Sequence, residues 1–323
     1  MKYIIARDQP ENAIEKARAV LNDGGLVVVP TETVYGLAAD ADNGKAIARI
    51  FAVKQRPGFN PLICHVSDLT MAEDYGVFSP MARRLAEEFW PGPLTLVLPL
   101  KQRAPVHPLV NAGLDSIALR CPEGIVGHII AELGRPLAAP SANTSGKISP
   151  TKAAHVIADL GNKVDLVIDG GASAVGLEST IIKIDGNTVT LLRAGAITEK
   201  MLETVAGVSL ERADSNASIE APGMMKSHYA PRAIMRLNAS GAQKGEALLG
   251  FGPWTAADKC GNRINLSAKG DLVEAASNLY DYLKQLDASG VQLIAVKPIP
   301  ADGLGEAIND RLQRAAAPRK EGS

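Results

Sequence analysis

The chain has 323 residues, of which 46% are hydrophobic and 21% charged, and this composition excludes a disordered or fibrous protein. Lys and Arg number 34 against 35 Asp and Glu, a formal charge of −1, which does not indicate a protein that depends on long-range attraction to nucleic acid. The length exceeds what one hydrophobic core usually serves and predicts about two domains.

The few cysteines exclude a disulfide-stapled secreted protein. Cys64, Cys121 and Cys260 lie far apart, in no metal-ligand spacing, and this usage favours a reducing compartment. Asp8 and Glu11 precede any apolar region of a signal peptide. No apolar run approaches the roughly 18 residues that span a bilayer. We therefore expect a cytoplasmic protein with no membrane partner.

The first two thirds of the chain alternate between helix and strand patterns. Helical spacing of apolar residues predicts helices at 12–22, 46–53, 80–90, 126–133, 151–160 and 198–205. Short apolar runs rich in β-branched residues predict strands at 26–29, 62–66, 94–98, 117–120, 137–139, 166–168, 180–184 and 188–192. This alternation is typical of a mixed α/β sheet with flanking helices.

The pattern fades at 207–223, which has the polar, Ser/Ala-rich composition of a linker. A second alternation follows, with strands expected at 234–237, 247–251 and 293–296 and helices at 272–286 and 305–316. We predict a first domain at 1–206, a linker at 207–232 and a smaller α/β domain at 233–323.

Polar segments follow several of the expected strands, where ligands gather in α/β sheets. The segment 30–37 (PTETVYGL) is, by itself, better explained as a helix N-cap and turn. The segment 140–146 (PSANTSG) would let backbone N–H groups approach a phosphate or carboxylate, and an ordinary turn explains it equally well. Neither a GxxxxGK[ST] loop nor a GxGxxG fingerprint occurs.

Two cations, Lys54 and Arg56, end an expected helix just before a Pro-Gly loop. They would complement the helix dipole, worth about 0.3–1 kcal/mol, or form a phosphate clamp. His65, in the next strand, is by itself more typical of a core histidine. Arg120 and Arg193 each end an apolar run, where a guanidinium reaches solvent or pairs with an anion.

These side chains suit polyanion binding with electrostatic stabilisation rather than covalent catalysis. No G-x-S-x-G elbow and no HExxH or other metal-ligand cluster is present, so no protein-held metal is predicted. The residues alone indicate an α/β protein with a phosphate-bearing ligand, which includes ATP.

A series of ordered motifs resembles the YrdC-domain family: PTETVYGLAAD, KQRPGFNPLICHV, WPGPLTLVL, LRCP, PSANTSGKISPT, GLESTII and LLRAG. The later stretch PGMMKSHYAP, followed by a second α/β pattern, is similar to the two-domain branch, the threonylcarbamoyl-AMP synthases. The resemblance implies a YrdC-type twisted open sheet with flanking helices and a smaller Rossmann-like C-terminal domain.

The resemblance also implies the reaction. L-threonine, bicarbonate and ATP, with Mg²⁺, would give threonylcarbamoyl-AMP, pyrophosphate and water. A downstream tRNA-modifying transferase would use the product to make threonylcarbamoyladenosine in tRNA, and strong direct binding of nucleic acid by this chain is not expected.

The motifs carry the family's site onto this chain. Threonine would contact Thr33, His65, Arg120 and Ser179. ATP would contact Lys54, Arg56, Asn60, Ser116, Ser141, Asn143, Ser149 and Arg193, of which Lys54 and Arg56 would also be catalytic. His228 and Tyr229 would belong to a lid formed by the linker. Many relatives read PGMKYxHY there, so MMKSHY displaces the lysine by one position and leaves open which linker side chain contacts ATP.

Two other functions compete with this one. A carbamoyl-transfer module of hydrogenase maturation would carry acylphosphatase and zinc-finger segments, which the chain lacks. An RNA-binding translation or ribosome-assembly factor of the YrdC type would favour a more basic chain. Threonine-dependent release of pyrophosphate from ATP would distinguish the synthase from both.

Overall fold

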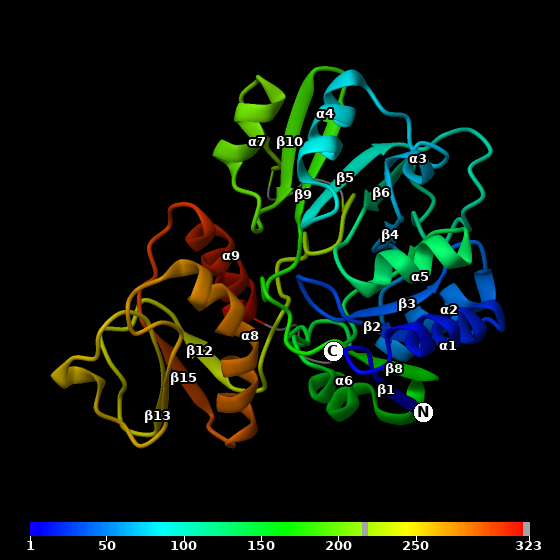
Figure 1. Cartoon of the computed structure of the whole chain (residues 1–323). Coiled ribbons are helices and arrows are strands. Elements are labelled where there is room, and N and C mark those ends of the chain that lie inside the picture. The colour runs from blue at the N-terminus through cyan, green and yellow to red at the C-terminus, as the bar shows by residue number, and fades with distance from the viewer. Residues whose placement is uncertain (215–218, 319–323) are drawn as a thin grey trace.

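The computed structural model describes residues 1–214 and 219–318. Its strands form a large mixed sheet and a small parallel sheet (Figure 1), and the predicted linker at 207–232 contributes the short strand Glu211–Arg212 to the large sheet. The strands of the large sheet are β1 (Lys2–Ile5), β2 (Val27–Val29), β3 (Gly36–Asp40), β4 (Ile63–His65), β5 (Leu94–Pro99), β6 (Ser116–Arg120), β7 (Leu137–Ala138), β8 (Leu166–Asp169), β9 (Thr180–Asp185), β10 (Thr188–Arg193) and β11 (Glu211–Arg212).

The large sheet has the strand order β1-β8-β2-β3-β7-β4-β6-β5-β9-β10-β11, with parallel and antiparallel pairs. The helices that cover it are α1 (Pro10–Asn22), α2 (Gly44–Lys54), α3 (Leu69–Ala72), α4 (Pro80–Phe89), α5 (Ile125–Leu133), α6 (Ala153–Leu160) and α7 (Glu199–Ala206). The predicted mixed α/β class is confirmed, and each helix and strand predicted here has a counterpart whose ends differ by a few residues.

Several short elements were not predicted. The clearest is β3, because segment 30–37 was interpreted as the start of a helix, which is wrong: Val29 pairs with Gly36, and the chain turns back as an antiparallel strand. All five residues of β3 are buried, and its small side chains show neither the alternation of a half-exposed strand nor helical spacing.

The C-terminal region forms a parallel sheet of order β12-β15-β13-β14. Its elements are β12 (Ile234–Arg236), β13 (Glu246–Gly250), β14 (Arg263–Asn265), β15 (Leu293–Val296), α8 (Leu272–Ala288) and α9 (Leu304–Ala316). Helices α8 and α9 lie on the side of this sheet that faces the large sheet (Figure 1). Val34, Ile148 and Leu177 of the N-terminal region are buried in the same apolar cluster as this sheet, so the two parts share a core.

Helix length and composition also bear on membrane contact. Among the described residues, none of the helices combines the length and apolar character that a membrane span requires.

Helix α2 delivers Lys54 and Arg56 to the edge of the sheet, and its N-cap provides a stability test. The side chain of Asn43 accepts hydrogen bonds from the backbone N–H groups of Lys45 and Ala46. Asn43→Ala removes this cap and should lower the free energy of unfolding by about 1 kcal/mol in urea titrations. Asn43→Asp keeps the acceptor, so its free energy of unfolding should remain within a few tenths of a kcal/mol of wild type. An equal loss of stability in both variants would contradict the capping role.

Candidate active site

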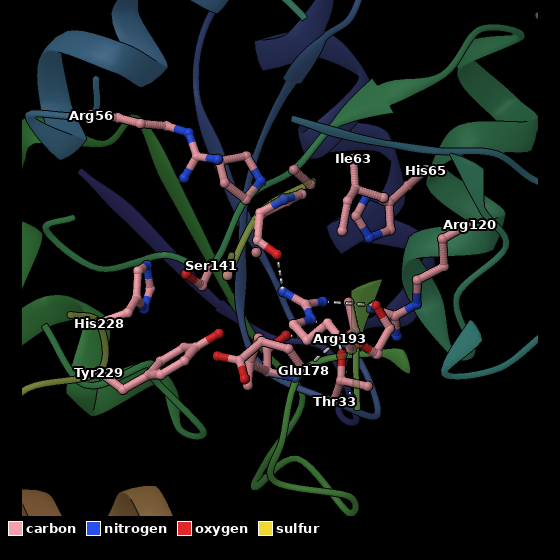
Figure 2. Close-up of a pocket in the computed structure, with 18 residues that line it drawn as sticks. Thr33, Arg56, Ile63, His65, Arg120, Ser141, Glu178, Arg193, His228 and Tyr229 are labelled. Atoms are coloured by element: carbon pink, nitrogen blue, oxygen red, sulfur yellow. Dashed lines mark hydrogen bonds between the residues drawn. The ribbon is translucent and has the colours of Figure 1, made fainter. Parts of the chain in front are cut away.

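A narrow cavity lies where loops of the large sheet meet the linker (Figure 2). Nine of the fourteen predicted site residues line it: Thr33, Arg56, His65, Arg120, Ser141, Ser179, Arg193, His228 and Tyr229. Its volume is about 50 Å³, which is room for a few water molecules and far less than a nucleotide needs. The fold therefore brings together residues that are up to about three fifths of the chain apart in sequence, with His228 and Tyr229 forming the linker side of the cavity.

Adjacent strands place a histidine beside an arginine. Because β4 and β6 are parallel and His65 is in register with Arg120, their side chains lie on the same face of the sheet. Burial, with a smaller contribution from Arg120, lowers the pKa of His65 to about 3, so the ring is neutral at pH 7. Its buried Nδ1 has no hydrogen-bond partner in the described structure, which leaves a polar atom for a ligand.

Two hydroxyl groups complete this side of the cavity. Thr33, in the β2–β3 turn, shares a 2.9 Å hydrogen bond with Thr31. Ser179 precedes β9 and shares a 2.7 Å hydrogen bond with Thr95 of β5. Both predicted residues are fully buried, so neighbouring hydroxyls fix their orientation.

Arg120 has an acidic partner that sequence analysis missed. Its Nη2 lies 2.6 Å from Oε1 of Glu32, and its Nε donates to the Gly92 carbonyl at 3.2 Å. Both charged side chains are at most 7% exposed, so the pair is close to neutral and still presents a planar guanidinium at the cavity. Glu32 lies in the PTETVYG segment, but nothing in its spacing indicates which arginine it meets.

Lys54 and Arg56 form no salt bridge with any residue that the structure describes. Arg56 donates to the Asn60 carbonyl, to Oδ1 of Asn60 at 2.8 Å and to the Pro61 carbonyl at 2.7 Å. Burial lowers its pKa to about 10. Lys54 donates through Nζ to the carbonyls of Ser141 and Asn143 at 2.5 Å, and burial followed by repulsion from Arg56 lowers its pKa well below the usual value.

Arg193 holds the other wall of the cavity. Its Nε and Nη2 donate to the carbonyl and hydroxyl of Ser179 at 3.0 and 3.1 Å, and its Nη1 donates to the Pro222 carbonyl at 3.2 Å. Within the described residues, none of Lys54, Arg56 and Arg193 forms a salt bridge, although each is at most 9% exposed. Buried cations without anions are unfavourable, and a polyanionic ligand would offset their charge.

Five predicted residues lie outside the cavity lining: Lys54, Asn60, Ser116, Asn143 and Ser149. Asn60 orients Arg56 through its side-chain carbonyl. Asn143 donates to two loop carbonyls, and its buried Oδ1 has no partner in the described structure. Ser116 begins β6, opposite Pro99 of β5 and at the far end of the strand from Arg120. Asn60 and Lys54 thus lie behind the cavity lining and hold Arg56 and the Ser141 loop, which form part of it.

Glu178 is the second acid that sequence analysis missed, and it lines the cavity. Its Oε1 accepts from Ser149 at 2.5 Å, and its Oε2 accepts from Tyr280 and Arg311 at 2.8 and 2.9 Å. Burial alone would raise its pKa, but Arg311 and Arg193, with the Ser149 hydrogen bond, lower it to about 2. Glu178 is part of the GLESTII motif, but the sequence does not indicate that residues of α8 and α9 bind it.

The linker closes the cavity through His228 and Tyr229. Tyr229 adopts a positive φ of 63° and is 1% exposed, with its ring 4.1 Å from that of His228 and 5.7 Å from that of Tyr280. Burial lowers the pKa of His228 to about 3, and its Nδ1 has no partner in the described structure. Ala230 N donates to the Gly146 carbonyl at 2.8 Å, which joins the linker to the 140–146 loop.

The depressed pKa of His65 predicts acid sensitivity. Between about pH 6.5 and 3 the unfolded chain binds a proton at this residue and the folded chain does not, so stability falls as the pH falls. At about pH 5 the loss from His65 is about 2 kcal/mol relative to neutral pH. Urea titrations at about pH 7.5 and pH 5 measure how far the free energy of unfolding falls between the two pH values. This decrease should be about 2 kcal/mol smaller in His65→Asn than in wild type. An unchanged drop in the variant would show that His65 ionises normally in the folded protein.

Comparison with known proteins identifies the family. Residues 19–195 match the Sua5/YciO/YrdC family, described as telomere recombination, and residues 197–317 match the C-terminal domain of threonylcarbamoyl-AMP synthase. The threonylcarbamoyl-AMP synthase of Bacillus subtilis is 38% identical, covering 95% of this chain and 93% of the relative.

Solved structures agree. Pyrococcus abyssi Sua5 complexed with L-threonine is 36% identical with a TM-score of 0.87, covering 98% of this chain and 97% of that one. A full-length HypF is 18% identical with a TM-score of 0.51 and matches over only 28% of its length, a likeness that shows the fold alone. The chain therefore belongs to the two-domain, Sua5-type threonylcarbamoyl-AMP synthases, nucleotidyltransferases of tRNA modification.

Proposed function

We propose that this synthase converts L-threonine, bicarbonate and ATP into threonylcarbamoyl-AMP, pyrophosphate and water at the cavity described above. The observation that carries the proposal is the convergence of hydroxyls, a neutral imidazole and unneutralised buried cations on one small space. The threonine-bound structure of the Pyrococcus relative supports the amino-acid part.

The threonine subsite is assigned to Thr33, His65, Arg120 and Ser179. Arg120 would bind the carboxylate through its guanidinium, which has donors besides the one engaged with Glu32. Neutral His65 would hydrogen-bond through the unpartnered Nδ1 without adding charge. This nearly neutral wall suits a zwitterionic amino acid.

The ATP subsite is assigned to the cationic wall. Arg56 and Arg193 would bind phosphate oxygens, and Lys54 would shape the loop of Ser141 and Asn143 or turn to the phosphates when they arrive. Asn60, Ser116 and Ser149 complete the assignment that the family resemblance makes.

In the adenylation step, an oxygen of the carbamate group of threonylcarbamate forms a bond to the α-phosphorus, and the bond between the α-phosphorus and pyrophosphate breaks. Lys54 and Arg56 are proposed as the catalytic residues because cations stabilise the charge that grows on pyrophosphate. No covalent enzyme intermediate is required.

Mg²⁺ is proposed to enter with ATP. The described residues contain no cluster of three or more His, Cys, Asp or Glu side chains that could hold a metal. Both acids near the cavity, Glu32 and Glu178, are engaged by arginines. The phosphates would therefore supply the metal ligands, as Mg²⁺ in nucleotide sites commonly requires, and the ion would supply charge neutralisation.

Residues 207–232 are proposed as a lid between domains at 1–206 and 233–323. A cavity of about 50 Å³ cannot admit ATP, so the segment with His228 and Tyr229 must move for substrates to enter. The closed form would then shield the labile mixed anhydride from water until a tRNA-modifying transferase receives it. A cytoplasmic location, consistent with three free cysteines, belongs to the same proposal.

The basic test is pyrophosphate release from ATP and bicarbonate with and without L-threonine. The proposal expects release that depends on threonine. Salt-sensitive tRNA binding with no threonine-dependent release would contradict it and favour the RNA-binding alternative.

The two arginine assignments predict opposite kinetic effects. Arg120→Lys keeps the charge but removes the guanidinium fork, so KM for threonine should rise about tenfold or more while KM for ATP changes little. Arg56→Lys should show the reverse pattern. Steady-state pyrophosphate release with each substrate varied in turn provides the measurement, and a matching rise of both KM values in both variants would refute the two-subsite division.

Gly223 tests the lid. A Cβ at this position would lie 2.8 Å from Cδ of Arg193 and 3.0 Å from Oη of Tyr229. Gly223→Ala should therefore displace the linker, raise KM for ATP severalfold and hasten hydrolysis of the product. Gly245→Ala is the control, because Gly245 has nearly the same φ, +89° against +88°, with nothing within 4 Å of its Cβ. Equal behaviour of the two variants would assign the effect to backbone strain.

A further inference from the structure

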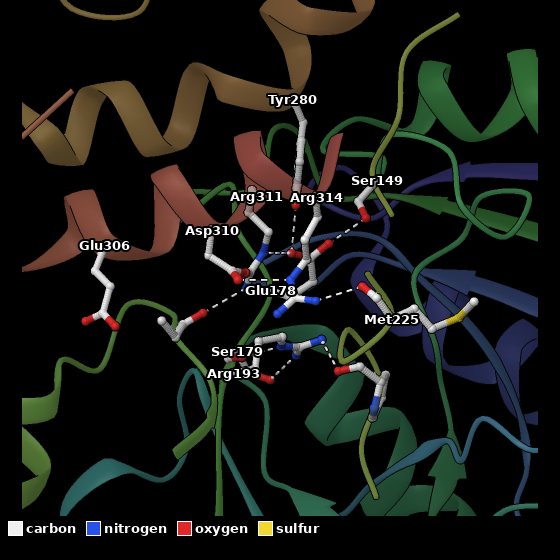
Figure 3. Close-up of polar contacts among 12 residues, drawn as sticks. Ser149, Glu178, Ser179, Arg193, Met225, Tyr280, Glu306, Asp310, Arg311 and Arg314 are labelled. Carbon is white, nitrogen blue, oxygen red and sulfur yellow. Dashed lines mark hydrogen bonds and ion pairs between the residues drawn. The ribbon is translucent and has the colours of Figure 1, made fainter. Parts of the chain in front are cut away.

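Helix α9 reaches from the C-terminal sheet to the cavity wall (Figure 3). Its Arg311 is 1% exposed and donates through Nε to Oε2 of Glu178 and through Nη2 to the Ala194 carbonyl, both at 2.9 Å. The 303–317 stretch that carries this arginine has no role in the assignments above.

The two acceptors flank the two site residues that contact each other. Glu178 immediately precedes Ser179, and Ala194 immediately follows Arg193. Arg193 in turn donates to both the carbonyl and the hydroxyl of Ser179. One guanidinium on α9 therefore binds the side chain of Glu178 and the backbone carbonyl of Ala194, the residues next to both members of the contact between the proposed threonine and ATP subsites.

The same turn of α9 holds the linker. Asp310 accepts from Nη1 of Arg311 at 2.6 Å and from Nε of Arg314 at 2.9 Å, which aligns the two guanidinium groups. Arg314 donates to the Met225 carbonyl at 2.7 Å and accepts at its own carbonyl from His228 N at 3.2 Å. The guanidinium of Arg311 also lies 5.3 Å from the centre of the Tyr229 ring.

The charge of Glu178 makes the contact with Arg311 important for the electrostatics of the cavity. It is the one carboxylate in the cavity lining within the described residues, and it faces a wall that includes Arg193. Without Arg311, its buried charge would lack its closest cation, and Arg193 would be the nearest replacement. That pairing would withdraw Arg193 from a phosphate ligand.

We propose that Arg311 is a positioning residue of the synthase, which holds Glu178 away from Arg193 and links closure of the linker to the geometry of the Ser179–Arg193 contact. This inference rests on the proposed assignment of Arg193 to ATP. Arg311 does not line the cavity, so it would act through its contacts with Glu178, Ala194 and Tyr229.

The test measures KM for ATP and kcat by threonine-dependent pyrophosphate release. Arg311→Met keeps the length of the side chain without its charge, and should raise KM for ATP at least about tenfold. The double variant Arg311→Met/Glu178→Gln removes the competing carboxylate and should recover most of that loss. A purely structural connection between the two regions predicts no recovery, because the second substitution removes still more of the contact.

A matched control breaks another ion pair across the same boundary. Nζ of Lys152 lies 2.8 Å from Oδ2 of Asp281, away from the cavity lining. Lys152→Met should leave KM for ATP within about twofold of wild type, which reports the effect of losing an interdomain ion pair alone. Thermal unfolding would verify that every variant assayed is folded.

The outcomes are separable. If folded Arg311→Met keeps the wild-type KM for ATP, or the double variant recovers nothing, the positioning role is overturned while the synthase assignment stands. If wild type itself shows no threonine-dependent release, the proposed function fails first. Should Arg311→Met not fold, Arg311→Gln with and without Glu178→Gln provides the same comparison, because glutamine also removes the positive charge but keeps a polar side chain with N–H donors.

Discussion

An uneven distribution of charge around one cavity underlies the rest of this structure. On one wall, Arg120 is paired with Glu32 and His65 is neutral, so the net charge is near zero. On the other, Arg56 and Arg193 are buried among neutral acceptors. Glu178 offsets part of the charge of Arg193, and a polyanionic ligand would offset the rest of the unfavourable burial of these cations. In the proposed function, a zwitterion and a polyphosphate would each meet a surface of suitable charge within one small space.

Such a cavity requires exclusion of water. In bulk water the attraction between a guanidinium and a phosphate is weak, whereas behind a closed linker it is several times stronger. The linker reaches this position through contacts on both sides: Ala230 bonds to Gly146 of the large-sheet region, and Tyr229 packs beside Tyr280 of α8. Because both contacts involve residues of one short segment, the proposed opening of the lid for substrate would also admit water to the cavity.

Local patterns were sufficient for most of the fold. Apolar spacing located α2 and β6, and the motifs located His65 and Arg193, because each of these signals lies within a few consecutive residues. Strand β3 was missed because its buried small residues carry no periodicity. The pairing of Arg120 with Glu32 could not be predicted for a different reason: the two residues are 88 positions apart, and they meet only because the folded sheet places the turn between β2 and β3 near the end of β6.

The same reasoning explains why Glu178 was overlooked although its motif was noticed. A carboxylate would repel the phosphates that the cavity is proposed to bind, and the sequence near Glu178 does not show which cation neutralises it. That cation is Arg311, which lies 133 positions further along the chain. Gly176 makes the approach feasible, since a Cβ there would lie 2.5 Å from Cα of Ser277 on α8. Because Arg311 of α9 is the largest of the contributions that lower the pKa of this carboxylate, the charge distribution of the cavity depends on the C-terminal region as well as on the large sheet.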